Sequence, residues 1–507
     1  MKKNMRLLLS TVVSIFTLFL FSTAHAQLHE DLQKQIVVVG GGLAGLAALD
    51  ELQSMGYTNV ILLESADRLG GKVQTQFHAD GTFQENGAEL VNASDADLIR
   101  LLKKYQINLV ERKFAHDDGE KIFQFRERRW SNGQLTLGPP KDYTFKELVD
   151  TMLKNPADVE ALSKIAKFQS NPTAETRKFL EETTAADFLK GSELVLALTQ
   201  AFMESELGAA LEDMNAATIL QNIRVEDGRY ILNPHADETY RIEGGSDRLI
   251  RKLGAKYQKN IRLNAAVSAI QKQSENSPYV VTAIIDGTET QVQADAVIMA
   301  APTYALPKMK INVPGVSQTD IDEATKMPFA NNAKILLRVD KRFWQGRTRF
   351  QGELILESGI EMWETSENQA TDHALLTIYT RAWPQDAQKA QSKLESLLLK
   401  IEGSKGFEGL RSHILETQVF SYDRSYSCIY NKNFPQSRVP ELFKKTIAGL
   451  IKGLAFIGSD KDYDFENGEL VPAATHGYMT GAVHSALMSV TSVLESLRLP
   501  VRCEGLY

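Results

Sequence analysis

A glycine-rich segment near the N-terminus constrains the fold of this chain more than any other feature. The run Ile36-Val37-Val38-Val39 leads directly into Gly40-Gly41-Gly42-Leu43-Ala44-Gly45, and a continuous β-branched run is typical of a strand buried on both faces. Leucines at helical spacing follow, and a second apolar run from Val60 to Leu63 ends at Glu64. The pattern predicts a βαβ unit, the building block of a parallel α/β sheet.

The spacing of the glycines indicates a dinucleotide site. Gly40 permits a tight turn, Gly42 lets a pyrophosphate approach the backbone, and Gly45 lets the helix pack closely on the strand. The start of the helix, which includes Leu43 and Ala44, offers free N–H groups to the phosphates. Glu64, with Ser65 beside it, is placed to accept hydrogen bonds from the ribose hydroxyls of the adenosine half. The alternative is an ordinary tight turn, but strand, helix, second strand and acid all occur in the expected order.

Composition limits the other classes of protein. The 507 residues are 43% hydrophobic and 24% charged, which predicts a large core and two or three domains. A formal net charge of -7 provides no basic surface for nucleic acid. The two cysteines, Cys428 and Cys503, can form neither a disulfide framework nor a four-thiolate site, and no other cluster has metal-ligand spacing, so no metal is expected.

The first 26 residues are typical of a cleaved export signal. Lys2, Lys3 and Arg6 precede an apolar run from Leu7 to Phe21, and Ala24-His25-Ala26 supplies small residues at a cleavage site. The alternative is a membrane anchor, but the run is shorter than the roughly 20 residues that span a bilayer. We therefore expect a periplasmic or secreted protein without a stable membrane anchor after cleavage. Because the leader lacks a twin-arginine pair, we expect export of the unfolded chain and cofactor uptake outside the cytoplasm.

The segment after Glu64 resembles the flavin-containing amine oxidase family, which includes monoamine, polyamine and L-amino-acid oxidases. In the stretch from Ser65 to Thr75, Arg68, Gly70 and Gly71 match the family's arginine and double-glycine segment, and Lys72 replaces its usual second arginine. In the family this segment surrounds the pyrophosphate and ribityl chain of FAD. The resemblance therefore implies that the dinucleotide is FAD.

Further matches extend the resemblance from about residue 35 to residue 493. The run Glu85-Asn86-Gly87-Ala88-Glu89-Leu90 resembles the element that passes the flavin ring, and Val267 stands where a backbone holds the adenine. Leu454 to Gly458 resembles the family's last strand, and Gly477-Tyr478-Met479-Thr480-Gly481-Ala482-Val483 resembles the helix that points at the flavin. Ser459 and Thr480 depart from the family's glutamates, and Asp460 is a candidate replacement for the first. The FAD contacts implied by this resemblance are Gly87, Ala88, Glu89, Val267, Gly458, Ser459, Asp460, Tyr478, Met479 and Ala482.

The resemblance also implies residues over the flavin. Tyr478 and Tyr426 are candidates for two aromatic walls around the substrate nitrogen, although both could be packed core aromatics. Ser425 stands where monoamine oxidases carry the cysteine bonded to the flavin, which implies noncovalent FAD. Lys308 or Lys310 is the candidate for the family's lysine that holds a water near flavin N5, although both could be solvated surface lysines.

The implied fold class is α/β, with a Rossmann-like FAD-binding domain and an interleaved α+β substrate-binding domain. We assign residues 33–97, 235–304 and 420–500 to the first and residues 98–234 and 305–419 to the second. Residues 142–222 have helical periodicity, and residues 332–380 are rich in strand formers.

The implied function is FAD-dependent oxidation of a C–N bond, with hydride transfer to flavin N5. The products would be an imine, hydrolysed to an aldehyde, and hydrogen peroxide from oxygen. No arginine follows Gly87-Ala88 to bind an amino-acid carboxylate, whereas Glu89 and Asn92 lie near the acidic position of polyamine oxidases. A small-molecule substrate that is a primary amine or polyamine is therefore favoured. Two alternatives are a carotenoid- or porphyrinogen-type C–C desaturase and a cofactor-less binding protein of the same fold.

Overall fold

The computed structural model describes residues 30–501 except 113–120, 132–133, 227–228, 233–236, 351, 382, 423–429, 467–468 and 474–475. The expected export signal, Tyr426, Ser425 and both cysteines therefore lie outside the described residues.

A five-stranded parallel sheet contains the predicted βαβ unit. Its strand order is β12-β2-β1-β16-β23, and β1 pairs with β2 and β16 so that Ile36 lies opposite both Val60 and Ala296. Helix α2 connects β1 to β2, which confirms the βαβ prediction. The bounds of these elements are β1 Ile36–Val39, α2 Leu43–Ser54, β2 Val60–Leu63, β12 Ile261–Arg262, β16 Ala296–Met299 and β23 Leu454–Phe456.

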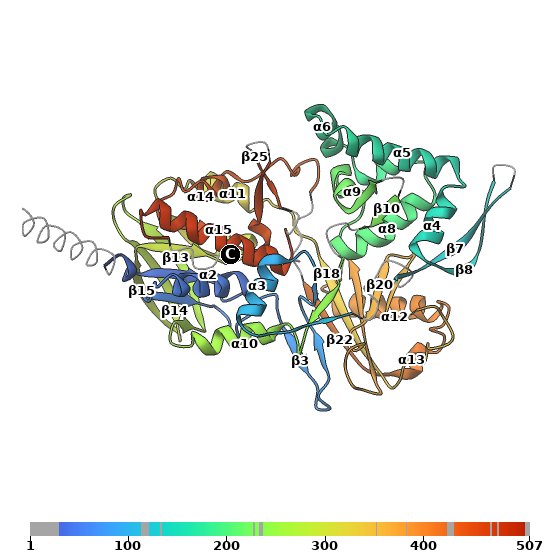
Figure 1. Cartoon of the computed structure of the whole chain (residues 1–507), viewed down its shortest axis with the longest axis horizontal. Coiled ribbons are helices and arrows are strands. Elements are labelled where there is room, and N and C mark those ends of the chain that lie inside the picture. The colour runs from blue at the N-terminus through green and yellow to red at the C-terminus, as the bar shows by residue number, and fades with distance from the viewer. Residues whose placement is uncertain are drawn as a thin grey trace, which may run out of the picture.

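Both faces of the parallel sheet are covered. Ile36 and Val38 pack on one face against helices from opposite ends of the chain, and in Figure 1 the N-terminal α2 lies beside the C-terminal α15. Val37 and Val39 pack on the other face. The helices of the first face are α2, α3 (Ala96–Lys104), α10 (Asp247–Lys256) and α15 (Met479–Ser496).

A second sheet packs near the other face, with the strand order β15-β14-β13-β17. It contains the hairpin predicted from the Asp286-Gly287 turn, in which Ile285 lies opposite Thr288. The bounds on this side are β13 Ala265–Lys272, β14 Tyr279–Ile285, β15 Thr288–Ala294, η1 Thr303–Lys308, β17 Lys310–Asn312, α11 Gln318–Ala324 and α14 Glu441–Ile447.

Residues 305–327 belong to this core and not to the substrate-binding part expected from the sequence. Leu306, Ile311 and Ile321 are buried in the same apolar cluster as Val37 and Val39. Strand β17 also pairs with β13. The chain therefore leaves the cofactor side later than the predicted boundary at residue 304.

The other half of the molecule is built around a seven-stranded sheet of order β22-β18-β21-β20-β19-β7-β8. Alternation along β7 divides its side chains, because Phe123 and Phe125 pack against one group of helices and Ile122 packs on the opposite face. In Figure 1 helices α4, α5, α6, α8 and α9 lie above this sheet, and α12 and α13 lie below it.

The bounds of the sheet are β7 Lys121–Ser131, β8 Gln134–Tyr143, β18 Asn332–Val339, β19 Glu353–Leu356, β20 Ile360–Glu364, β21 Ala374–Arg381 and β22 Ile414–Tyr422. Its helices are α4 Phe145–Met152, α5 Pro156–Ser170, α6 Ala174–Glu182, α7 Ala185–Leu189, α8 Leu194–Leu207, α9 Ala216–Asn222, α12 Ala387–Glu402 and α13 Leu410–His413. The predicted helical and strand-rich stretches are both present.

Short strands connect the two halves. A three-stranded sheet of order β5-β11-β6 brings residues near 90, 110 and 240 together. The remaining bounds are β3 Thr75–Phe77, β4 Phe83–Glu85, β5 Leu90–Val91, β6 Leu109–Glu111, β9 Ile223–Glu226, β10 Arg229–Leu232, β11 Tyr240–Ile242, η2 Ser459–Lys461, β24 Tyr463–Glu466 and β25 Glu469–Pro472. No helix in the described part of the chain has both the length and the apolar character needed to span a membrane.

Candidate active site

One cavity of about 810 Å³ runs from the parallel sheet into the second half of the molecule. Its first wall is formed where β1, β2 and β16 end, at Val39, Leu63 and the segment that begins at Ala300. Ligands of parallel α/β sheets bind at the carboxyl ends of the strands. The cavity therefore lies where the sequence predicts a dinucleotide.

The glycine loop leaves its backbone open to this cavity. Gly40 has a φ of +108°, and a Cβ on Gly45 would lie 1.9 Å from the Gly40 carbonyl oxygen, so α2 packs against the loop too closely for any side chain. A Cβ on Gly42 would meet no atom closer than 3.9 Å. The face of Gly42 is therefore free for a ligand to approach the start of the helix.

Glu64 is fixed at the end of β2. Its carboxylate accepts hydrogen bonds from the backbone N–H groups of Gly41 at 2.6 Å and Ala66 at 2.7 Å. Both interactions hold a negative charge beside the glycine loop. Glu64 lines the cavity, and its role as a ribose-binding acid stays a prediction.

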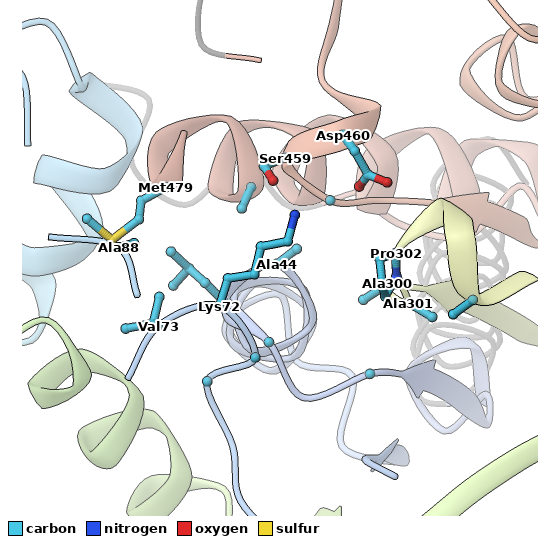
Figure 2. A pocket seen from close by; sticks show the side chains of 18 of the residues that line it. Ala44, Lys72, Val73, Ala88, Ala300, Ala301, Pro302, Ser459, Asp460 and Met479 are labelled. Carbon is cyan, nitrogen blue, oxygen red and sulfur yellow. The ribbon is translucent and has the colours of Figure 1, made fainter. Parts of the chain in front are cut away.

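The second glycine segment pairs with the first. The Gly70 N–H donates to the Gly41 carbonyl at 2.9 Å, and Arg68 donates to the carbonyls of Gly71 at 2.8 Å and Leu69 at 3.1 Å. Arg68 therefore braces its own loop while it borders the cavity. Figure 2 shows the Lys72 amine extending toward the segment that carries Ser459 and Asp460. Burial lowers the pKa of Lys72 to about 8, against the opposing effect of Asp460.

Residues from two segments near the C-terminus, 458–460 and 477–482, form the wall of the cavity beside Lys72. Asp460 accepts hydrogen bonds from the Thr303 N–H at 2.9 Å and from Lys461 Nζ at 2.8 Å. Burial opposes its ionisation, but Lys461 and Lys72 hold its pKa well below the usual range. Helix α15 begins after Tyr478, and none of the described side chains caps its N-terminus. The first N–H groups of α15 and its positive dipole end therefore lie at the cavity wall.

Most residues predicted to contact FAD line this one cavity. They are Gly40, Gly42, Leu43, Ala44, Glu64, Ser65, Arg68, Gly70, Gly71, Lys72, Ala88, Glu89, Val267, Gly458, Ser459, Asp460, Tyr478, Met479 and Ala482. Gly45 and Gly87 lie behind the wall, where a Cβ on Gly87 would come within 1.9 Å of the Lys72 carbonyl. Lys308 also borders the cavity, whereas Lys310 is exposed on β17 and lies outside the wall.

A buried lysine that the sequence analysis missed lies behind the part of the wall formed by Ala88, Glu89 and Leu90. Lys334 on β18 is fully buried, and its Nζ donates to the Gly87 carbonyl at 3.1 Å and to Glu89 at 2.7 Å. A usable signal is present in the sequence, because Lys334 begins the apolar strand Lys334-Ile335-Leu336-Leu337. A lysine inside a buried strand requires a buried partner.

The negative charge of Glu89 is compensated by cationic neighbours. It accepts hydrogen bonds from Lys334, from Trp363 Nε1 at 3.0 Å and from Arg241 Nε at 3.3 Å. Burial opposes its ionisation, but Lys334 and Arg241 lower its pKa to about 2. Glu89 is therefore an ionised acid within a buried network. Its charge is already paired, so it is a poor partner for a polyamine.

The far half of the cavity is acidic and aromatic. Trp363 and Tyr379 border it with their rings 4.8 Å apart at 75°. Four glutamates from separate segments line the same region: Glu206, Glu238, Glu353 and Glu361. No local pattern in the sequence identifies this group, because its members are brought together only by tertiary folding. The described residues contain no cluster suited to hold a metal ion.

The chain matches the family model described as flavin containing amine oxidoreductase over residues 43–401. It is 24% identical to amine oxidase [flavin-containing] B of Sus scrofa over 490 residues, which covers 91% of this chain and 86% of the relative. It is 23% identical to probable polyamine oxidase 4 of Arabidopsis thaliana, which covers 75% of this chain and 73% of that one.

Solved structures have the same fold. A wild-type putrescine oxidase bound to putrescine gives a TM-score of 0.63 at 17% identity, with 91% of this chain and 99% of the other covered. Cyclohexylamine oxidase from Brevibacterium oxydans IH-35A gives 0.64 at 15% identity, with 92% and 100% covered.

The fold and the cavity define a mixed α/β flavoenzyme. The chain belongs to the family of flavin-containing amine oxidoreductases. It is an FAD-dependent amine oxidase.

Proposed function

We propose that this enzyme holds FAD noncovalently in a Rossmann-like domain and oxidises the C–N bond of a primary amine or polyamine, with oxygen as the electron acceptor. The observation that carries the proposal is the continuity of the cavity. One space joins the glycine loop at Gly42, the start of α15 at Tyr478 and the acidic region at Glu361. Cofactor and substrate could therefore meet without a change of fold.

The residues of the first half fit FAD. The open face of Gly42 and the start of α2 suit a pyrophosphate, and the Glu64 carboxylate suits ribose hydroxyls. Val267 also lines the cavity, and we assign it to the adenine. Ser425, in place of a flavin-linked cysteine, supports noncovalent binding.

Bound FAD would supply the acceptor for a hydride equivalent from the carbon beside the amine nitrogen, and oxygen would take up the two electrons, so that an imine and hydrogen peroxide would result. The protein's part is to hold charge around this centre. The N-terminus of α15 supplies a positive dipole end at Tyr478 and Met479. Lys334, held against Gly87, is our candidate for the lysine near the flavin ring in place of Lys308 or Lys310, because it is the buried one.

The substrate nitrogen is proposed to lie beside Tyr478, with Tyr426 as the second wall. Oxidation requires a neutral amine, and the enzyme can select it from solution without a strong protein base. The resemblance to putrescine and cyclohexylamine oxidases supports an amine substrate rather than the C–C bond of a desaturase.

We also propose the domain division and export predicted from the sequence, with residues 305–327 moved to the FAD-binding domain. Removal of residues 1–26 leaves Gln27 as the mature N-terminus. N-terminal sequencing of the protein exported from a bacterial host should begin at Gln27. A protein retained in the cytoplasm with an intact Met1 would contradict export.

The function is tested by hydrogen peroxide release from the purified, FAD-loaded mature protein. Monoamines, polyamines and amino acids are compared, and we expect turnover of amines but not of amino acids. Tyr478→Ala should lower amine turnover strongly, whereas Tyr478→Phe should retain most of it. Unchanged amine turnover in Tyr478→Ala, or absence of amine oxidation in the wild-type enzyme, would contradict the proposal.

A further inference from the structure

Two glutamates in the far half of the cavity lie against each other. Glu206 comes from α8 and Glu361 from β20, and their carboxyl groups are hydrogen-bonded. Glu361 is only 2% exposed, and its Oε2 accepts a hydrogen bond from Ser205 Oγ at 3.2 Å. Both side chains nevertheless border the cavity. We call them the acid pair.

The neighbouring cations are occupied by other acids. Lys121 on β7 pairs with Glu353 at 2.6 Å and Glu238 at 3.4 Å. Arg112, which follows β6, is within 3.5 Å of the same two acids and of Glu367. Within the described ranges, no ion pair to a lysine or arginine involves Glu206 or Glu361. In the part of the chain that the structure describes, the acid pair therefore lacks the cationic partners that buried carboxylates normally have.

Among the described residues, the charged network around the acid pair has more acids than cations. Its members are connected through the contacts of Arg112, Lys121, Arg241 and Lys334 and through the acid pair. The four cations face the six carboxylates Glu89, Glu206, Glu238, Glu353, Glu361 and Glu367. If every group is ionised, the excess of two negative charges equals the charge of the acid pair.

The excess of negative charge in the network agrees with the raised pKa values of the acid pair. Burial and the nearby charge of Glu238 raise the pKa of Glu206 to about 7, although Lys121 opposes the shift. Burial and the charge of Glu206 raise the pKa of Glu361 well above its usual range. The pair would ionise fully only if a cation entered the cavity beside it.

We infer that Glu206 and Glu361 form a subsite for a second ammonium group of the substrate, so that the enzyme's preferred substrates are diamines or polyamines. The inference rests on the proposed function, because the first amino group must react at the flavin. Trp363 and Tyr379 border the same half of the cavity and offer apolar surface to the methylene chain between the two nitrogens. A monoamine would leave the acid pair without a partner.

The test compares substrates that differ only in the second charge. The FAD-loaded mature enzyme is assayed by peroxide release with unbranched diamines from putrescine upward, each paired with the monoamine of equal chain length. We expect higher kcat/KM for the diamines. Glu206→Gln and Glu361→Gln should each lower kcat/KM for the best diamine by about 30-fold, chiefly through KM, and change that for its monoamine little.

Two controls make the comparison specific. Glu193→Gln removes an exposed carboxylate at the start of the same helix, outside the cavity, and should leave the ratio of diamine to monoamine unchanged. A measurement on the wild-type enzyme needs no variant: the preference for the diamine should decline as the pH falls, because protonation of the acid pair removes its negative charge. Both substrates must present a neutral amine to the flavin, so this shared pH dependence is removed when kcat/KM for the diamine is divided by kcat/KM for the monoamine.

The outcomes separate the inference from the proposed function. Equal losses for diamine and monoamine in both variants, or a diamine preference that is constant with pH, would overturn the subsite. A wild-type enzyme that oxidises monoamines as well as their paired diamines would overturn it too, while the proposed function would stand. An enzyme that oxidises no amine would contradict both.

Discussion

Single residues of this cavity differ in how their charge is compensated. Glu89 lies between Lys334 and Arg241 and is held ionised. Glu206 and Glu361, in the same cavity, face mainly other acids and favour protonation. Chemically identical side chains therefore have opposite roles: the first is a structural ion and the other two are available to a ligand.

Lys334→Met is expected to lower amine turnover by about 100-fold, the size typical of losing a positioned proton-transfer group. The change removes the amine that contacts Gly87 and Glu89 but keeps a chain of similar size. The measurement is kcat by peroxide release, with flavin absorbance to show that FAD is still bound. The same substitution at Lys308 or Lys310 tests the two candidates from the sequence. A larger loss at either one than at Lys334 would contradict our assignment.

Glu206→Gln is expected to raise stability at alkaline pH. The pKa of this glutamate in the folded protein is about 7, against 4.5 for an ordinary glutamate. Its contribution to stability is thus fully present below pH 4.5 and is lost as the pH rises through 7. The amide does not ionise, so the variant should be more stable than the wild-type protein by about 3 kcal/mol at pH 8.

Thermal unfolding of the substrate-free, FAD-loaded protein at a series of pH values measures this difference. The gain in Tm should shrink toward zero near pH 5, where the wild-type carboxyl is protonated in the fold. Glu193→Gln, which removes an exposed charge, should show no such trend. A Glu206→Gln variant less stable than the wild-type protein at pH 8 would contradict the raised pKa.

At the scale of elements, two helix starts define the flavin half of the cavity. Helix α2 begins at the glycine loop and α15 begins at Tyr478, and the two helices pack side by side (Figure 1). Each start directs unpaired N–H groups toward the same space. The electrostatic environment of the cofactor therefore depends on the position of these helices as much as on charged side chains.

Gly45→Ala should displace α2 from the loop. The new Cβ would come within 1.9 Å of the Gly40 carbonyl oxygen, and a clash with backbone is relieved only by moving the helix. We expect a loss of about 3 kcal/mol in stability and strongly reduced FAD content, measured by the ratio of flavin to protein absorbance. Gly254→Ala in α10 is the matched control, since its Cβ would meet only the end of the Leu69 side chain. Full FAD content in Gly45→Ala would contradict the packing argument.

The flavin half could be predicted from the sequence because its signals are local. The run from Ile36 to Gly45 specifies a strand, a turn and a helix within a short window, and Glu64 follows at a regular distance. The acid pair could not be predicted, because Glu206 lies in an apolar helix and Glu361 in a short strand more than 150 residues away. Only the packing of α8 on β20 brings them together. Lys334 did carry a local signal, as a lysine in an apolar strand, but its partner Gly87 could not be predicted because it lies 247 residues away, between β4 and β5.

At the scale of the whole molecule, a buried arginine connects the halves. Arg112 follows β6 of the small three-stranded sheet, and its guanidinium reaches Glu353 on β19 of the seven-stranded sheet and Glu367 after β20. Its side chain is 2% exposed. The two sheets are therefore joined by a charge contact as well as by covalent connections.

Arg112→Met should destabilise the protein by about 3–5 kcal/mol, because it leaves buried carboxylates with fewer cations. Thermal unfolding of the FAD-loaded protein measures the change. Arg411→Met, which breaks an ion pair to Glu402 that is more than half exposed on the arginine side, should change the Tm little. A loss in Arg112→Met no larger than in Arg411→Met would show that the network is unimportant for stability.

The parallel sheet also determines when the cofactor site can form. Its strands come from residues 36–63, 261–299 and 454–456, so β1 acquires its neighbour β16 only after more than two hundred further residues have been made. Contacts of such long range make folding slow, because the chain must close large loops before it gains their energy. The start of α15, at residue 479, is synthesised later still. During synthesis, the FAD site is thus completed only after residue 479 has been made, and a chain truncated before that residue would lack one wall of the site.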